Sequence, residues 1–270
     1  MTVDPQLPWW WDDPQRMKYL KQLLRADPTN VRLNELARLA FKEQDLITET
    51  EWHSTLCPYT LLNHIQYTTN DRKWRLLAVA SVREIEHWVT EDCCRKMMDL
   101  AERHSDGLVT DETIESLRHH ATRVAWPSQT GIAPYTADFV ASQVGIAEKG
   151  ADCVWRARWV HGMVWQVIMA MGTRYTDETR ALRDESDCQL IREIFGNPFR
   201  PMALDAAWHA PTVIGIARSI YEQKQFSHMP LLADALEEAG CHLSDVLHHC
   251  RSGEQHWRGC WLLDVLLAKD

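Results

Sequence analysis

The stretch ADCVWRARWVHGMVWQVIMAMGTR, residues 151–174, decides the fold class. Large apolar side chains recur around its whole circumference, at Trp155, Trp159, Val160, Met163, Val164, Val167, Ile168 and Met171. A helix without a polar face belongs in the centre of a helical bundle. Its arginines and His161 make it too polar to be a transmembrane span. We therefore expect a central, buried helix here.

Helix start and stop signals continue on both sides of this stretch. Thr48 and Glu51 have the spacing of a capping box, and residues 71–89 repeat apolar side chains at helical spacing. Thr90 is expected to cap the next helix and Gly107 to end it in the left-handed conformation. Strand-like alternation bounded by hairpin turns is absent. The sequence thus predicts an all-α protein, either an irregular multi-helix bundle or a short solenoid-like stack of helices.

The chain length of 270 residues corresponds to one large domain or two small ones. We expect an N-terminal helical region with a Trp-rich arm at 1–130. A central apolar helix region should follow at 131–186 and a C-terminal helical unit at 187–270. These three regions are also compatible with one domain.

The charge balance bears on the class of partner. There are 29 Lys and Arg against 38 Asp and Glu, which gives a net charge of −9. A basic footprint supplies most of the non-specific affinity of nucleic-acid-binding proteins. The acidic balance therefore argues against direct nucleic-acid binding and against an electrostatic membrane-surface role. The acidic start MTVDP lacks a secretory apolar region, and eight cysteines are few for this length, so we expect a cytoplasmic protein with reduced thiols.

A resemblance is carried by four strings in the C-terminal part. They are IREIFGNPFRP at 191–201, LADALEEAGC at 232–241, HCR at 249–251 and HWRGCWLLD at 256–264. They resemble a block that recurs in a large paralogous group of uncharacterised planctomycete proteins. The N-terminal similarity to that group is weaker and covers 50–52, 71–78 and 101–108. The resemblance implies a helical bacterial protein and no activity, because none is known for the group.

C-terminal cysteines and histidines are the candidate metal ligands. Thiolate and imidazole are the ligands that zinc prefers, and a four-residue spacing would put His256 and Cys260 on one helix face. The spacing lacks the paired regularity of established zinc motifs. We therefore favour small buried core cysteines, which need no cofactor. The alternative is a zinc site built from Cys241, His249, Cys250, His256 and Cys260.

No catalytic motif is present, so the sequence favours a protein without catalysis and assigns no catalytic residue, but it leaves an enzyme open because active sites are assembled in space. Nucleophile elbows, phosphate-binding glycine loops and the HExxH pattern are all missing. Asp264 is the most interesting single acid, because leucines and a valine flank it. If buried, it needs a cation, for which Arg258 or Arg200 is the expected partner. We favour an ion pair that fixes the C-terminal helix over catalysis.

Binding of a partner is predicted from two segments. Trp9, Trp10 and Trp11 cannot all point into one core, and tryptophan is enriched at interface hot spots. This arm either packs on its own domain or contacts another protein or a second copy. Asn197 and Arg200 lie in a compact turn, which we interpret mainly as structural and alternatively as a partner contact.

The leading hypothesis is a non-catalytic helical interaction module, a subunit or adaptor of a larger cytoplasmic assembly. The alternative is a zinc protein, structural or hydrolytic. A third hypothesis is a subunit of a nucleoprotein or defence assembly in which a partner holds the nucleic acid.

Overall fold

The computed structural model describes residues 47–66, 70–126, 136–172, 176–200, 202 and 206–269. Within these ranges the chain forms α-helices and short 3-10 helices and no β-strand, so the prediction of an all-α protein is confirmed. The α-helices are α3 (Glu49–Ser54), α4 (Pro58–Ile65), α5 (Asp71–Arg83), α6 (Asp92–Ser105), α7 (Asp111–Ala125), α8 (Ala137–Ser142), α9 (Ala151–Ala170), α10 (Asp177–Phe195), α11 (Pro211–Gln223), α12 (Met229–Glu238), α13 (Ser244–Arg251) and α14 (Trp261–Leu266). The 3-10 helices are η3 (Glu86–Trp88), η4 (Ala206–His209) and η5 (Phe226–His228). None of these helices has the length and apolarity that a membrane span needs.

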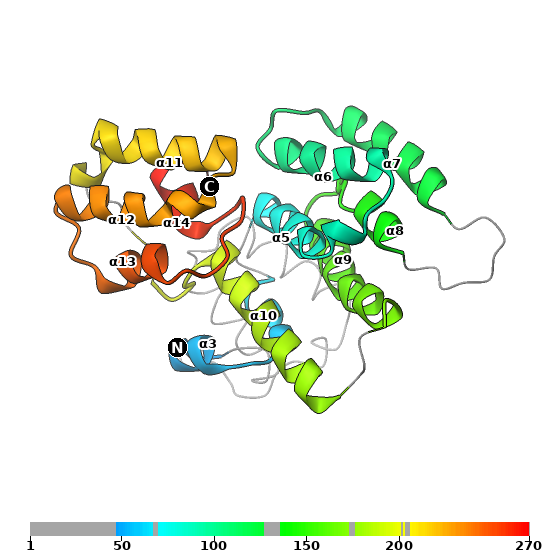
Figure 1. The fold of residues 1–270 in the computed structure, drawn as a ribbon, viewed down its shortest axis with the longest axis horizontal. Coiled ribbons are helices and arrows are strands. Elements are labelled where there is room, and N and C mark those ends of the chain that lie inside the picture. The colour runs from blue at the N-terminus through cyan, green and yellow to red at the C-terminus, as the bar shows by residue number, and fades with distance from the viewer. Residues whose placement is uncertain are drawn as a thin grey trace, which may run out of the picture.

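Helix α5 lies at the centre of the larger helical group, where it packs against α6, α8, α9 and α10 (Figure 1). The expectation that α9 takes this central place is wrong. Helix α9 packs against α5 and α8, and its Trp155 is 63% exposed. The physical reason lies in the arginines of α9. Arg156 and Arg158 need polar partners, which they find in Glu148 and Asn63, and these contacts keep that helix at the edge of the group.

Local capping explains where several helices begin. Thr48 and Glu51 form the predicted capping box of α3, with the Thr48 N–H donating to Glu51 Oε2 over 2.7 Å. The expected cap at Thr90 is wrong, because Glu91 is the N-cap residue of α6. Thr90 instead donates its N–H and its hydroxyl to the carboxylate of Asp138. The helix expected over 71–89 ends at Arg83, whose guanidinium pairs with acids of the following turn and of α6.

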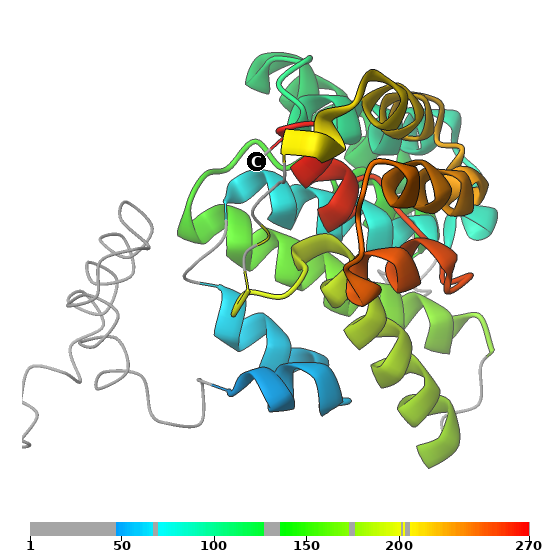
Figure 2. The same ribbon diagram turned by 90° about the vertical axis from the view of Figure 1, so that its left-hand side faces the viewer.

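Apolar side chains form two separate cores. The first core runs from Trp52 to Ile194 and takes residues from α3 to α10. The second core runs from Trp208 to Leu266 and takes residues from η4 to α14. Figures 1 and 2 show α11–α14 gathered beside α5 and α10. The first core thus draws on both of the regions expected at 1–130 and 131–186, and the chain passes between the cores after α10.

The connection between α13 and α14 holds the second core close to the first. Gly259 lies in this connection with a φ of +100°, a conformation that disfavours residues with a Cβ. A Cβ at this position would lie 3.0 Å from two side-chain atoms of Leu76 and 3.2 Å from Ile194. Only glycine therefore lets this connection approach α5 and α10 so closely.

This packing predicts that Gly259→Ala destabilises the protein more than Gly253→Ala does. Gly253 has a φ of +71° and open space around it, so alanine there adds only backbone strain of about 1–2 kcal/mol. Alanine at Gly259 adds overpacking of about 1–3 kcal/mol to the same strain. Thermal and urea unfolding followed by circular dichroism measures the difference. Equal losses in the two variants would contradict the close approach.

Candidate functional site

Four side chains with metal-ligand chemistry meet near the end of α10. They are Glu193, His249, His256 and Cys260, named here the Cys–His–Glu cluster, and one ligand atom of each lies within 4.8 Å of all the others. His249 Nε2 lies 3.2 Å from Cys260 Sγ and 3.5 Å from Glu193 Oε2. His256 Nδ1 lies 3.1 Å from Glu193 Oε1. The donor atoms are thus one sulfur, two nitrogens and a carboxylate.

Each member is placed by a different element. Glu193 lies in the last turns of α10, and His249 lies on α13. His256 belongs to the connection that follows α13, and Cys260 is the N-cap residue of α14. The cluster therefore joins α10, which carries first-core residues, to three positions within the short C-terminal segment 249–260.

The cluster is almost closed to water. Cys260 is fully buried, Glu193 and His256 are 7% and 6% exposed, and His249 is partly buried. The two imidazole rings make an edge-on contact with centroids 4.8 Å apart, and the Trp261 ring lies 4.9 Å from His249. The two ligand rings therefore pack against each other, and His249 also packs against Trp261.

Burial also sets the protonation of two members. Burial lowers the pKa of His249 to about 4, although the Glu193 carboxylate acts in the opposite direction. The ring is therefore neutral at pH 7 and keeps a lone pair for a metal. Burial raises the pKa of the Cys260 thiol well above its usual value, while the amides of Leu262 and Leu263 lower it.

The donor set and its spacing suit zinc. In a tetrahedral zinc site with bonds of about 2.0–2.3 Å, neighbouring ligand atoms lie roughly 3.3–3.8 Å apart. His249 Nε2 lies 3.2 Å from Cys260 Sγ, and the two oxygens of Glu193 lie 3.1 and 3.5 Å from the two histidines. With one ligand atom taken from each residue, all four lie within 4.8 Å of one another, so small side-chain movements would bring them to tetrahedral spacing. Sulfur and imidazole nitrogen favour zinc over magnesium or calcium, which prefer oxygen. Four protein ligands leave no open position, which is the pattern of a structural rather than a catalytic site.

The structure brings together three of the five cysteines and histidines that the sequence suggested. Cys241 and Cys250 are outside the cluster and are buried in the second core, as small apolar residues often are. Sequence reasoning missed Glu193. Its signal was a lone acid between Leu190, Ile191 and Ile194, which is the same argument that selected Asp264.

Of the residues predicted to bind a partner, the structure describes only Asn197 and Arg200. Trp9, Trp10 and Trp11 lie outside the described residues. Asn197 donates its amide to Glu49 Oε1 over 2.8 Å, and Arg200 pairs with the same oxygen at 2.7 Å. Both residues therefore hold the turn after α10 against α3, which agrees with the structural interpretation of that turn.

Asp264 is the centre of a second polar cluster. Its carboxylate is completely buried and accepts from Arg72 Nη1 at 2.7 Å and from Lys73 Nζ at 2.6 Å. The prediction that Arg258 or Arg200 pairs with Asp264 is wrong. Both true partners come from the first turn of α5, because the second core docks with α14 facing that helix end.

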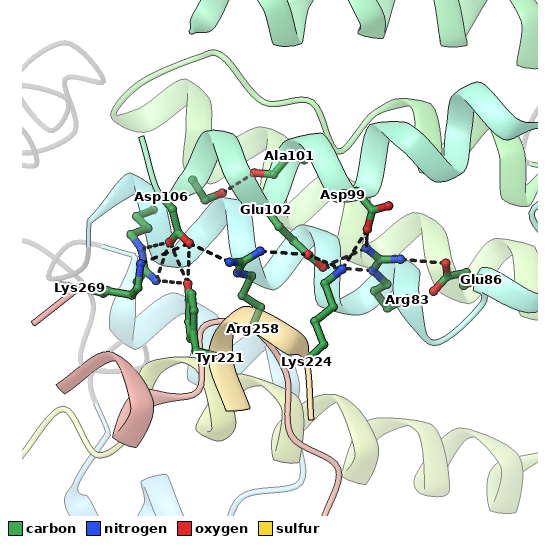
Figure 3. Close-up of polar contacts among 12 residues, drawn as sticks. Arg83, Glu86, Asp99, Ala101, Glu102, Asp106, Tyr221, Lys224, Arg258 and Lys269 are labelled. Carbon is green, nitrogen blue, oxygen red and sulfur yellow. Dashed lines mark hydrogen bonds and ion pairs between the residues drawn. The ribbon is translucent and has the colours of Figure 1, made fainter. Parts of the chain in front are cut away.

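This pairing is part of a longer interface ion network. Asp106 pairs with Arg72 at 3.1 Å. It also accepts from the Tyr221 hydroxyl over 2.8 Å and pairs with Arg258 and Lys269 at 3.4 Å each (Figure 3). The remaining members are Asp99 and Glu102 of α6, Arg83 at the end of α5, Glu86 of η3 and Lys224 directly after α11 (Figure 3). Every buried carboxylate here has a cation, so the network joins the cores and offers no unpaired acid for catalysis.

The comparisons with known proteins add no relative. No family model, no curated protein and no solved structure matches the chain. The resemblance to the planctomycete group stays a prediction.

The interface ion network predicts a large cost for Asp264→Asn. The change leaves Arg72 and Lys73 buried with one charge uncompensated, for which about 3–5 kcal/mol of unfolding free energy is expected. Asp234→Asn is the matched control, because Asp234 is 64% exposed and pairs only with a surface arginine. Urea unfolding of both variants measures the difference. A cost for Asp264→Asn as small as that of the control would contradict the assigned pairing.

Proposed function

We propose that this chain is a zinc-binding helical protein whose ion has a structural role. The observation that carries the proposal is the Cys–His–Glu cluster, in which four zinc-type donor atoms converge within 4.8 Å. A metal ion there would bond to α10 on one side and to the segment 249–260 on the other. It would therefore tie the second core to the first.

The burial of the ligands supports a structural ion over a hydrolytic one. A hydrolytic zinc keeps one position for water and needs access for a substrate. Here the sulfur ligand is fully buried, and all four donors are protein side chains. The energy of zinc binding would then add directly to the stability of the fold.

Removing one ligand should remove the metal. We expect purified wild-type protein to carry one zinc per chain in native mass spectrometry, and Cys260→Ala to lose it. Cys250→Ala is the matched control, because Cys250 is equally buried on the neighbouring helix but lies outside the cluster. Zinc at a hundred times its Kd stabilises the folded state by about 2.7 kcal/mol, so chelation should lower the unfolding midpoint of wild type and of the control.

Either of two results would reject the zinc proposal. One is wild-type protein that stays free of metal after reconstitution with zinc. The other is Cys260→Ala that holds zinc as tightly as Cys250→Ala does.

A second candidate function is self-association as an interaction module. A row of aromatic rings, Trp126, Phe139, Trp159 and Trp155, crosses α7, α8 and α9 with successive centroids 5.4–6.5 Å apart. Its two ends are exposed, Trp126 by 57% and Trp155 by 63%. Exposed tryptophans of this kind are common hot spots of protein interfaces. A second copy of the chain is the occupant that we propose for this aromatic row.

Sedimentation velocity tests the aromatic row. We expect a dimer of the wild type that dissociates in Trp155→Ser, because the substitution removes a large exposed ring. Leu231→Ser is the control, since Leu231 is 55% exposed on α12, away from the row. A wild type that stays monomeric at all concentrations, or a Trp155→Ser variant that still dimerises, would rule this interface out.

The setting that we propose is the bacterial cytoplasm. All eight cysteines are free, as expected where thiols are kept reduced. The net charge of −9 favours protein partners over nucleic acid.

A further inference from the structure

A pocket of about 280 Å³ lies between α4, α9 and α10, and none of its lining residues belongs to the Cys–His–Glu cluster. Tyr59 and Leu62 of α4 and Trp165 of α9 give it an apolar side. His161 of α9 lies in the lining as well, although this residue is only 6% exposed. The pocket therefore combines an apolar surface with a nearly buried imidazole ring.

The hydrogen-bond partners of His161 determine which ring nitrogen carries its hydrogen. The Ser81 hydroxyl oxygen lies 2.7 Å from the carbonyl oxygen of Leu77, so the hydroxyl proton has to lie between these two oxygens. The same hydroxyl oxygen lies 2.8 Å from His161 Nδ1 and has no second proton to donate, so Nδ1 carries the hydrogen. The other ring nitrogen, Nε2, is therefore an acceptor.

This acceptor lies on the pocket side of the ring. Nδ1 faces Ser81, which is fully buried in α5 and does not line the pocket, whereas Nε2 faces Asp187 of the pocket wall. Asp187 Oδ1 is 3.7 Å from Nε2, is itself an acceptor and pairs with Arg183 at 2.5 Å. Within the part of the chain that the structure describes, no group donates to Nε2. A buried acceptor without a donor costs free energy, so a ligand that donates to it is favoured.

The charges around the pocket balance, which favours a neutral ligand. Three guanidinium groups and three carboxylates lie in its wall or next to it, namely Arg158, Arg180, Arg183, Glu84, Asp184 and Asp187. Burial, together with the nearby Arg183 and Arg158, lowers the pKa of His161 to about 4, so this ring is neutral at pH 7. A charged ligand would add a charge without a partner, and a neutral donor would not.

We propose that this pocket binds a neutral aromatic group with one N–H donor, such as indole, with the N–H donating to His161 Nε2 and the ring packed against Tyr59 and Trp165. Indole N–H groups usually have a hydrogen-bond partner when they are buried, and aromatic rings pack favourably in offset or edge-on pairs. The pocket volume lies just below the range for drug-sized ligands, so it suits a single fused ring system.

Gly162 offers a way to close the pocket. It lines the cavity next to His161, and a Cβ added there would meet no atom within 4 Å. Leucine at this helical position should therefore fold, with better helix propensity than glycine. Gly215→Leu is the matched control, because Gly215 lies on α11 with equally open surroundings.

The test is a titration of the whole chain with indole, followed by nitrogen NMR of the histidine rings. The free protein should show His161 with hydrogen on Nδ1, and indole should shift its Nε2 signal saturably. Benzofuran has the same shape with an oxygen in place of the N–H, so it should bind about fivefold or more weakly. Gly162→Leu should weaken the binding of indole at least about tenfold, and Gly215→Leu should leave it unchanged.

A parallel titration distinguishes two sources of the indole group. One source is a free compound, and the other is the chain's own Trp9, Trp10 and Trp11, which lie outside the described residues. The second protein for this titration combines Trp9→Ala, Trp10→Ala and Trp11→Ala. Equal affinity of both proteins for indole assigns the pocket to a free ligand, whereas tighter binding by the variant assigns it to these tryptophans.

Four outcomes would overturn the proposal. Hydrogen on Nε2 of His161 in the free protein would remove the acceptor. The other three are the absence of a saturable shift at millimolar indole in both proteins, benzofuran that binds as tightly as indole, and equal affinity of Gly162→Leu and Gly215→Leu.

Discussion

A carboxylate without access to water, that of Asp264, constrains how the two cores can meet. A buried charge is tolerated only where cations and donors surround it. Arg72 and Lys73, from the first turn of α5, lie within 2.6–2.8 Å of it, and Asp106 shares Arg72. These partners belong to the first core. Any displacement of α14 from α5 would therefore leave the buried charges of Asp264, Arg72 and Lys73 without their partners. The polar interface therefore fixes the docking more specifically than apolar contact alone.

The same docking creates the Cys–His–Glu cluster. Lys73 donates to the carbonyl oxygen of Gly259 over 3.2 Å as well as to Asp264, so one ammonium group holds the residue beside Cys260. The glycine allows the connection to pack on Leu76 and Ile194, next to Glu193. The close packing at Gly259, the ligand Cys260 and the ion pair of Asp264 thus all lie within six residues of the chain. A zinc ion would strengthen a junction that the ion network has already positioned.

Local signals in the sequence predicted much of the fold, and distant contacts explain what they missed. The capping box at Thr48 and the left-handed Gly107 depend on neighbouring residues and could be read directly. Helical periodicity gave the all-α class. It did not place α9 at the edge, because burial depends on which helices pack around it. Three of the four cluster residues lie in the segment 249–260, but Glu193 is more than fifty positions upstream. The partners of Asp264 are likewise remote, since only folding brings α5 to α14.

X-ray absorption spectroscopy of the zinc-loaded protein tests the proposed ligand set, because it counts the atoms bound to the metal. We expect one sulfur at about 2.3 Å and a remaining shell of nitrogen and oxygen at about 2.0–2.2 Å, four ligands in all. Two or more sulfur ligands would contradict it, since they would require Cys241 or Cys250. A shell of oxygen atoms alone would contradict it as well, because zinc would then be bound elsewhere on the surface.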